Sequence, residues 1–315
     1  MPTNTQSGKA FEFALISEAY NILSPSHNVN LITNAVYQNS RACFDIFTTV
    51  QKAKYMQAAS TAIRHIITLE PRLNNPSNAR DTLTLQLQPD SAGISGDVRD
   101  ILFIRSSQNW EVGISAKNNH KALKHSRLSN VLDFGNSWVG VPSSPQYFQA
   151  INPVFTRLAE LRLAGAYWRD MANKQTEIYR PILDAFRNEL IAINVANPNI
   201  PQVLITYLIG NRDFYKVMKR ARVVEVFAFN LHGTLGQSAG TVRTPIRIPR
   251  LTLPTQIIQF SMAPRSQDTL LLVCNNGWQI SFRIHNAESL VVPSLKFDVN
   301  LVGNPNNMYS HHIAY

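Results

Sequence analysis

Carboxylates, a serine and a lysine stand close together in one stretch of the sequence, at spacings that suit phosphate ester hydrolysis. Asp97 and Asp100 precede an apolar run, and Glu111, Ser115 and Lys117 follow at even spacing in the next segment. Side chains at even spacing in a β-strand lie on one face of the sheet. Carboxylate oxygens bind Mg²⁺, which bridges to phosphate oxygens and lowers the pKa of a bound water. A nearby lysine can orient that water, help to deprotonate it and stabilise the transition state.

The residues directly after Lys117 carry an excess of positive charge. Three cations and two histidines lie among amides and hydroxyls in residues 118–129, and no acid occurs between Lys117 and Asp133. In the whole chain 30 Lys and Arg outnumber 20 Asp and Glu, a net charge of +10, although only 16% of the residues are charged. Since typical domains hold about 25% charged residues, the excess comes from too few acids. Such a positive field favours a polyanionic partner such as nucleic acid.

The composition excludes several protein classes. Hydrophobic residues make up 44% of the 315 residues, which is enough for a packed core and excludes intrinsic disorder. No apolar run approaches the roughly 20 residues that span a bilayer, and the first residues are polar, so we expect a soluble protein that is not exported. The two cysteines, Cys43 and Cys274, lie far apart, which excludes a disulfide scaffold and favours the cytoplasm.

Apolar periodicity predicts a helical N-terminal third. Residues 9–22 have apolar side chains at spacings of three and four, the pattern of an amphipathic helix, with Ser7 as its N-cap. Helical texture continues through residues 28–47 and 51–69. A loop rich in Asn and Pro follows at residues 71–80.

The pattern changes to strands at residue 82. Alternating leucines at 83–87 and apolar segments at 98–104 and 110–116, separated by polar turns, predict an antiparallel meander. The basic residues at 119–128 are then predicted to form a short helix. This meander would carry the acids and the lysine on adjacent strands.

Helices are expected again between residues 146 and 209, and strands after residue 222. The expected strands are residues 223–229, 244–248, 257–260, 270–274 and 278–284, followed by a polar tail around His311 and His312. The fold class is therefore α+β. We expect one unit over residues 1–315, with a core and N-terminal helices at 1–145, a helical region at 146–222 and a β-rich region at 223–315.

Three long segments resemble a known enzyme family. The segment WEVGISAKNNHKALKHSRLS at 110–129 resembles the signature of HaeIII-like type II restriction endonucleases, which belong to the PD-(D/E)XK nuclease superfamily. YLIGNRDFYKV at 207–217 and FRIHNAESLVVPSLKFDV at 282–299 resemble two further stretches of that family. The resemblance implies a central mixed sheet flanked by helices and Mg²⁺-dependent cleavage of double-stranded DNA at GGCC. It also implies a restriction–modification system in which a partner methyltransferase protects the host DNA.

The resemblance assigns roles to the candidate residues. The first aspartate is Asp100, with Asp97 as the alternative, and the catalytic lysine is Lys117. The sequence departs from the superfamily pattern at Ser115, where an acid is usual, so another carboxylate must serve as metal ligand. Glu111 shares the face of Lys117 but lies six residues away, roughly 20 Å along a strand, unless a bulge shortens the path. Glu12 matches a Gly-x-x-x-Glu element of the superfamily and is the preferred candidate.

The remaining candidates are residues expected to contact DNA. Those around the scissile phosphate or in the groove are Ser115, Asn118, Asn119, His120, Lys121, Lys124, His125 and Arg127. Those expected to clamp the DNA backbone are Lys216, Lys219 and Arg220. A helix at 119–128 would read the guanines of GGCC. The palindrome favours a two-fold homodimer, with a monomer that cuts the strands in sequence as the alternative.

Two other functions are consistent with the same residues. A structure-specific or repair nuclease would share the catalytic core. A non-catalytic DNA-binding protein would use the basic residues alone, and its acids would be structural. Incubation with plasmid DNA and Mg²⁺ distinguishes them, because only a restriction enzyme yields discrete fragments.

Overall fold

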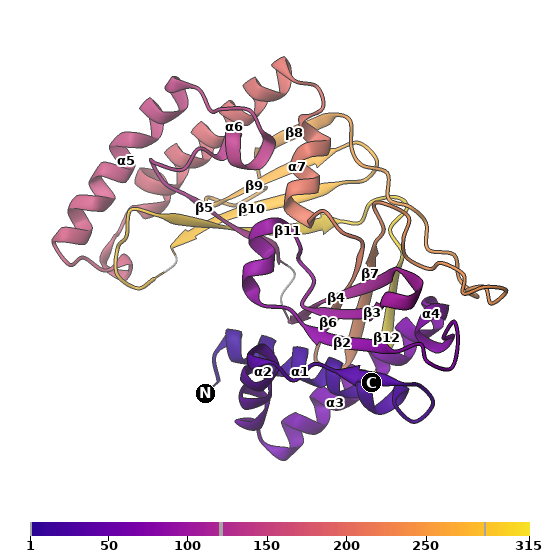
Figure 1. Ribbon diagram of the computed structural model, residues 1–315. Helices are drawn as coiled ribbons and strands as arrows, with labels where there is room; N and C mark the ends of the chain where they lie inside the picture. Colours follow the sequence, from indigo (N-terminus) through magenta and orange to yellow (C-terminus); the bar gives the residue numbers. More distant parts are fainter. Residues whose placement is uncertain (1, 120–121, 287) are drawn as a thin grey trace. The chain divides into compact units, whose positions relative to one another are not determined.

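Two β-sheets, each with its own helices, organise the chain (Figure 1). The computed structural model describes residues 2–119, 122–286 and 288–315. Unit 1 consists of residues 1–121, 210–251 and 307–315, and unit 2 of residues 122–209 and 252–306. Each unit thus combines segments that are far apart in the sequence, whereas the regions expected from composition were continuous.

The helices of unit 1 begin where capping residues stand. They are α1 (Asn4–Leu23), α2 (Ala35–Asp45), α3 (Thr49–Leu69) and the short α4 (Pro71–Asn74). The N-cap of α1 is Thr3, not the expected Ser7, because Thr3 and Gln6 form a reciprocal capping box. Thr48 and Gln51 cap α3 in the same way.

The sheet of unit 1 is mixed and has seven strands in the order β1-β2-β3-β4-β6-β7-β12. Their bounds are β1 (Val29–Leu31), β2 (Leu83–Leu87), β3 (Ile101–Arg105), β4 (Trp110–Asn118), β6 (Phe214–Lys219), β7 (Val223–Phe229) and β12 (Ser310–Ala314). Strands β1 and β2 pair in parallel, as do β4 and β6, and the other pairs are antiparallel. The predicted meander is confirmed as β2-β3-β4.

One face of this sheet packs against the helices. Val112, Ile114 and Ala116 of β4 are buried in a core that includes apolar residues of α1 and α3. The alternate residues of β4, among them Ser115 and Lys117, therefore point to the opposite side of the strand. The period-two pattern of the sequence thus separates the core residues of β4 from its candidate catalytic residues.

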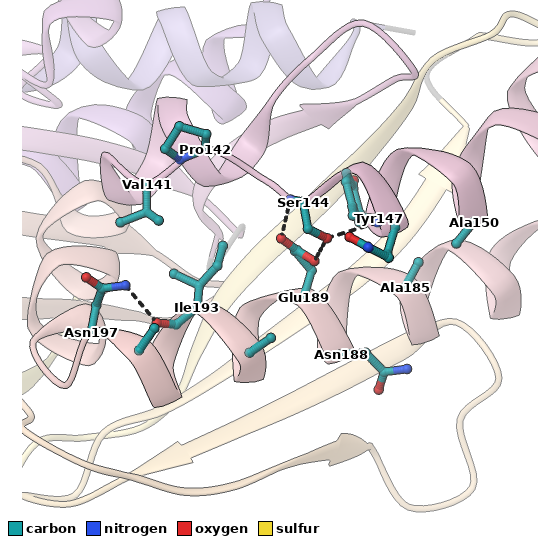
Figure 2. A pocket seen from close by; sticks show the side chains of 13 residues that line it. Val141, Pro142, Ser144, Tyr147, Ala150, Ala185, Asn188, Glu189, Ile193 and Asn197 are labelled. Atoms are coloured by element: carbon teal, nitrogen blue, oxygen red, sulfur yellow. Dashed lines mark hydrogen bonds between the residues drawn. The ribbon is translucent and has the colours of Figure 1, made fainter.

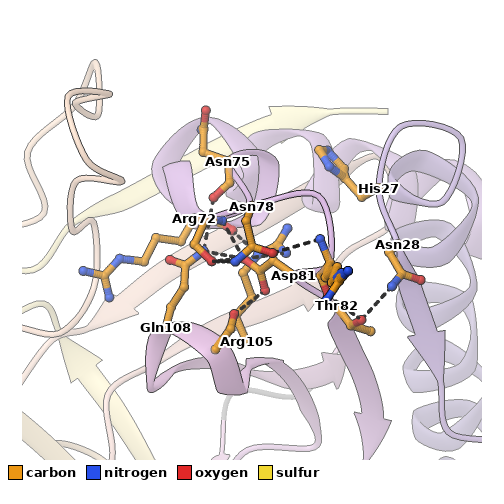
Figure 3. A network of polar contacts seen from close by, with 12 residues as sticks. His27, Asn28, Arg72, Asn75, Asn78, Asp81, Thr82, Arg105 and Gln108 are labelled. Carbon is orange, nitrogen blue, oxygen red and sulfur yellow. Dashed lines mark hydrogen bonds and ion pairs between the residues drawn. The ribbon is translucent and has the colours of Figure 1, made fainter.

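A buried polar network fixes the ends of the meander (Figure 3). Arg105 is fully buried, donates to the carbonyls of Arg72 and Leu73 and pairs with Asp81 at 3.4 Å. Burial alone would raise the pKa of Asp81, but hydrogen bonds from Ser107 and Gln108 and the Arg105 charge hold it well below its usual range. The network joins the loop before β2 to the end of β3, so it stabilises the strand that follows Asp100.

Unit 2 has an antiparallel five-stranded sheet in the order β5-β11-β10-β9-β8. The strands are β5 (Ala122–Leu128), β8 (Ile257–Met262), β9 (Thr269–Cys274), β10 (Gln279–Asn286) and β11 (Leu295–Gly303). Its helices are α5 (Pro145–Leu163), α6 (Arg180–Ala196) and α7 (Ile200–Ile209). Phe186 of α6 packs against Phe282 and Phe297 on one face of the sheet.

A hollow of about 630 Å³ lies between α5 and α6 (Figure 2). Its main polar pair is Ser144 and Glu189: the carboxylate of Glu189 accepts from the N–H and hydroxyl of Ser144, at 2.6 and 2.7 Å. Ser144 also caps α5. The pair therefore has a structural role at the start of a helix.

Several predictions of secondary structure are wrong. Strand β1 lies within residues 28–47, which were predicted to be helical, and strand β6 lies within the expected helical region 146–222. Residues 119–128 contain strand β5 instead of a helix, because Ser126 and Leu128 are buried while His125 and Arg127 are exposed, a period of two. Residues 244–248 form no strand, since Pro245 lies within them and Pro249 follows directly. The tail expected at 308–312 largely forms β12, which pairs with β7. Among the described residues, no helix is both long and apolar enough to cross a membrane.

Candidate active site

Asp100 stands just before β3, and its carboxylate reaches the neighbouring strand β4. Its Oδ2 accepts hydrogen bonds from the N–H of Ala116 at 2.7 Å and from Ser115 Oγ at 3.3 Å, and Lys117 Nζ lies 3.4 Å away. The N–H of Asp100 donates to the carbonyl of Ile114 at 2.8 Å, so strand pairing sets this geometry. The side chains of Asp100 and Lys117 are 21% and 29% exposed, so a substrate can reach them.

Glu12, the preferred candidate for the second carboxylate, lies near enough to this site for the charge of Asp100 to act on it. It lies on α1, which packs against β4, and its carboxylate accepts from Lys9 Nζ at 3.0 Å. Lys9 also pairs with Asp90 at 2.6 Å. The side chain of Glu12 is 8% exposed, and the charges of both Asp100 and Lys117 act on it. The fold therefore brings together Glu12 from α1, Asp100 from the position before β3, and Ser115 and Lys117 from β4.

The electrostatics of this site suit a divalent cation. Burial, assisted by the Asp100 carboxylate and opposed by Lys9 and Lys117, raises the pKa of Glu12 to about 7. Burial is the largest cause of this shift and the Asp100 charge adds to it, so the positive charges of Lys9 and Lys117 do not compensate for both. Carboxylate oxygens are the donors that Mg²⁺ prefers, and a dication between them would relieve the repulsion. Glu12 and Asp100 therefore fit a magnesium site.

Glu111 and Asp97 lie elsewhere, because Arg99 binds both of them. Arg99 pairs with Asp97 at 2.7 Å and with Glu111 at 2.9 Å, and its side chain is only 5% exposed. It crosses β4 at Gly113, where a Cβ atom would lie 2.2 Å from Arg99 Cδ. The pairing of β3 with β4 has no bulge at Gly113, so nothing shortens the path from Glu111 to Lys117. The structure does not bring Glu111 to the Asp100 site.

The two asparagines directly after Lys117 differ in their surroundings. Asn118 donates to the hydroxyl of Tyr55 at 3.2 Å, and the exposed Asn119 has a left-handed backbone with φ of 58°. His120 and Lys121, both predicted to bind DNA, lie outside the described residues.

The three cations predicted to clamp the DNA backbone do not form one exposed patch. Lys216 is 5% exposed, and the parallel pairing of β4 and β6 sets it in register with Ser115. Lys219 Nζ lies 5.0 Å from the centre of the Tyr55 ring. Arg220 donates to Glu225 at 3.1 Å. The count of cations in the sequence did not reveal that β6 lies between β4 and β7, inside the sheet, where its side chains are largely covered.

Strand β5 divides its basic residues between its two faces. Lys124 lies over the ring of Tyr207 with Nζ 3.6 Å from its centre, and burial lowers the pKa of this lysine. His125 and Arg127 are exposed on the other face. His125 pairs with Asp298 at 2.9 Å, and Arg127 donates to Ser294 at 3.3 Å. The prediction of DNA contacts therefore fits Arg127 better than Lys124.

Sequence reasoning missed two residues that shape the site. Lys9 is a buried lysine that holds Glu12, and its position one helical turn before Glu12 was the available signal. Arg99, between the two candidate aspartates, decides which of them is available. Its proximity to Glu111 depends on strand pairing and had no local signal.

Strands β3 and β4, the parallel strand β6 and helix α1 make up the framework that positions these side chains. With an aspartate before one strand and a lysine on its neighbour, this mixed sheet and its helices are consistent with the class of α+β nucleases. No solved structure is significantly similar to this chain.

Comparison with known sequences identifies the family within this class. The HaeIII restriction endonuclease family matches residues 8–305. The chain is 38% identical over 305 residues to the type II restriction enzyme HaeIII of Haemophilus aegyptius, covering 96% of this chain and 95% of that protein. The chain therefore belongs to the HaeIII restriction endonuclease family and is a type II site-specific deoxyribonuclease.

Proposed function

We propose that this enzyme hydrolyses both strands of double-stranded DNA at GGCC in the presence of Mg²⁺. The observation that carries the proposal is the cluster of Asp100, Lys117 and Ser115, in which the lysine amine and the serine hydroxyl lie within 3.4 Å of one carboxylate oxygen. The length of the match to HaeIII supports the choice of GGCC as target.

Each residue of the cluster has a distinct role in this proposal. Asp100 and Glu12 would hold the metal ion, which when bound would polarise the phosphate and lower the pKa of a water molecule. Lys117 orients the attacking water and donates to the phosphate oxygen on which negative charge develops. Ser115, where an acid is usual, donates to Asp100 and fixes the orientation of its carboxylate. Lys9 holds Glu12 in place.

We further propose that DNA contacts the open face of the sheet in unit 2. Its residues on β5, β10 and β11 include the cations Arg127, Arg283 and Lys296, with His125, His285 and the acid Asp298 beside them. The opposite face is apolar and packs against α6. Arginine pairs well with the O6 and N7 atoms of guanine in the major groove, so the exposed Arg127 is the candidate reader of GGCC.

The biological setting follows from the same proposal. The enzyme would act in the cytoplasm as part of a restriction–modification system, with a DNA methyltransferase that protects the GGCC sites of the host. A palindromic target is read by two identical half-sites, which favours a homodimer.

Digestion of plasmid DNA tests this function. With Mg²⁺ we expect discrete fragments whose ends map within GGCC, and with EDTA we expect intact DNA. The same plasmid methylated at its GGCC sites should remain intact. Fragments at another sequence would contradict the target, a smear would indicate a non-specific nuclease, and intact DNA under all conditions would indicate a DNA-binding protein.

A further inference from the structure

Unit 2 carries a second cluster of side chains that could bind a metal ion. His125 on β5, His285 on β10 and Asp298 on β11 each offer one ligand atom, and these atoms lie within 4.8 Å of one another. Asp298 pairs in register with His125 on one side and with Arg283 on the other. Three adjacent strands therefore bring together residues that are up to 173 positions apart, the separation of His125 and Asp298.

The distances suit a tetrahedral metal. Asp298 Oδ1 lies 2.9 Å from His125 Nδ1 and 3.8 Å from His285 Nε2. With metal–ligand bonds of about 2.0–2.1 Å, two ligands of a tetrahedral Zn²⁺ site stand roughly 3.3 Å apart. The observed distances lie on either side of that value, so small side-chain shifts would complete the geometry.

The hydrogen bond of His285 leaves one ring nitrogen available as a ligand. Its Nδ1 lies 2.8 Å from the carbonyl of Asn286 and must donate, because a carbonyl only accepts. In a neutral ring Nε2 then carries a lone pair, which faces the carboxylate of Asp298. Among the residues that the structure describes, Nε2 has no hydrogen-bond partner although it is buried. Histidine ligands usually donate their second nitrogen to a carbonyl in this way.

A hydrogen bond from Arg283 also orients the carboxylate of Asp298. Arg283 donates to its Oδ2 at 2.9 Å, so Oδ1 remains directed toward the two histidines. Ligating carboxylates are commonly held by such a second hydrogen bond. His125, whose side chain is 52% exposed, provides the access from solvent.

We propose that His125, His285 and Asp298 form a binding site for a transition-metal dication of the Zn²⁺ type. Two imidazoles and one carboxylate select such a metal over Mg²⁺, which prefers oxygen ligands. The site differs in ligand chemistry from the carboxylates of Glu12 and Asp100, and its existence does not depend on the proposed cleavage of GGCC. The ion would cross-link β5, β10 and β11, two of which carry the proposed DNA contacts Arg127 and Arg283.

An alternative to metal binding is that the cluster is held together by charges of the protein alone. Arg283, Lys296 and Arg127 lie on the same face of the sheet as the cluster, and their charges disfavour a dication. A proton on His285 would also resolve the contact between its Nε2 and Asp298. The two explanations differ in pH dependence, because a metal competes with protons for the ligand nitrogens of both histidines and so binds more tightly at pH 8 than at pH 6.

Cobalt absorption provides the test. Co²⁺ titrated into the enzyme at pH 8 with excess Mg²⁺ should give one equivalent of the intense visible absorption of tetrahedral Co²⁺, and Zn²⁺ should displace it. The Asp100→Asn variant should give the same spectrum, since the active site is not involved. His285→Gln and Asp298→Asn should lose it, whereas the exposed His312→Gln on β12 should keep it.

Other outcomes would overturn the proposal. They are no tetrahedral absorption in the wild-type enzyme, or absorption that survives in His285→Gln and is lost in Asp100→Asn. The melting temperature of the wild-type enzyme gives a readout that needs no variant: Zn²⁺ should raise it in the presence of excess Mg²⁺, and by less at pH 6. An unchanged melting temperature at pH 8 would contradict the site even if the variants failed to fold.

Discussion

Asp100, which precedes β3 in unit 1, and Asp298, which lies in β11 of unit 2, are both carboxylates beside basic side chains, but their surroundings differ. Asp100 contacts a lysine and a hydroxyl, and its charge interacts with a second carboxylate, that of Glu12. Asp298 contacts two histidines and an arginine. The first set offers mainly oxygen ligands and the second mainly nitrogen ligands. Neighbouring strands, rather than the aspartate itself, decide which chemistry each site can support.

The largest effect is expected at Asp100 and Lys117. Asp100→Asn or Lys117→Ala should reduce cleavage by at least about 100-fold, since each removes a group placed to stabilise the charge of the transition state. Binding of GGCC duplexes in a gel-shift assay should remain. Asp97→Asn is the matched control, because its carboxylate binds Arg99, and it should still cleave. Loss of cleavage in Asp97→Asn alone would show that the wrong aspartate has been assigned.

The next comparison separates the two candidate second carboxylates. Glu12→Gln should lower the rate of Mg²⁺-dependent cleavage about 10- to 100-fold, since it removes a metal ligand. Mn²⁺ should restore part of the rate, because it binds such sites more tightly. Glu111→Gln, whose carboxylate is held by Arg99, should stay within a few-fold of the wild-type rate. The reverse ranking in a single-turnover assay would reject the role of Glu12.

Stability without metal reports on the same carboxylate. Because the folded state holds a proton on Glu12 up to about pH 7 and the unfolded chain releases it near pH 4.5, the free energy of unfolding should fall as pH rises between these values. At pH 8 the ionised Glu12 should lower the free energy of unfolding by at most about 3 kcal/mol. Glu12→Gln should remove it in urea unfolding with EDTA.

The difference between wild type and Glu12→Gln isolates this effect. Glu70 has a pKa raised to about 7 by burial, and burial together with the charge of His311 lowers that of His65 to about 4, but both are common to the two proteins. A difference that does not change between pH 4.5 and 7 would mean that Glu12 is ionised throughout this range.

The smallest effect is expected on the basic strand β5. Arg127→Ala should cost about 1–3 kcal/mol in binding to GGCC and much less on unrelated duplexes, as expected of a base contact. Lys124→Ala should instead lower the melting temperature, because Lys124 packs on Tyr207. Equal losses on both kinds of DNA in Arg127→Ala would identify a phosphate contact.

Some features were predictable because they depend on local patterns. The α+β class, the N-terminal helices and the β2-β3-β4 meander follow from apolar periods of 3.6 and 2. Asp100 and Lys117 could be selected because one precedes an apolar strand and the other lies on the next strand. The prediction for residues 119–128 was wrong because their structure depends on a distant partner. Strand β11, with which they pair, begins at Leu295, and without it a short basic segment suits a helix equally well.

The sequence by itself determined the residue types, the strand periods and the family, since these are carried by neighbouring residues and long shared segments. Only the tertiary structure decided that Glu12 lies within the electrostatic influence of Asp100, and that Arg99 forms ion pairs with Asp97 and Glu111. It also decided that Lys216 is buried and that two histidines meet Asp298. The physical reason is that charges interact over a few ångströms in space, and strand pairing sets those distances between residues far apart in the chain.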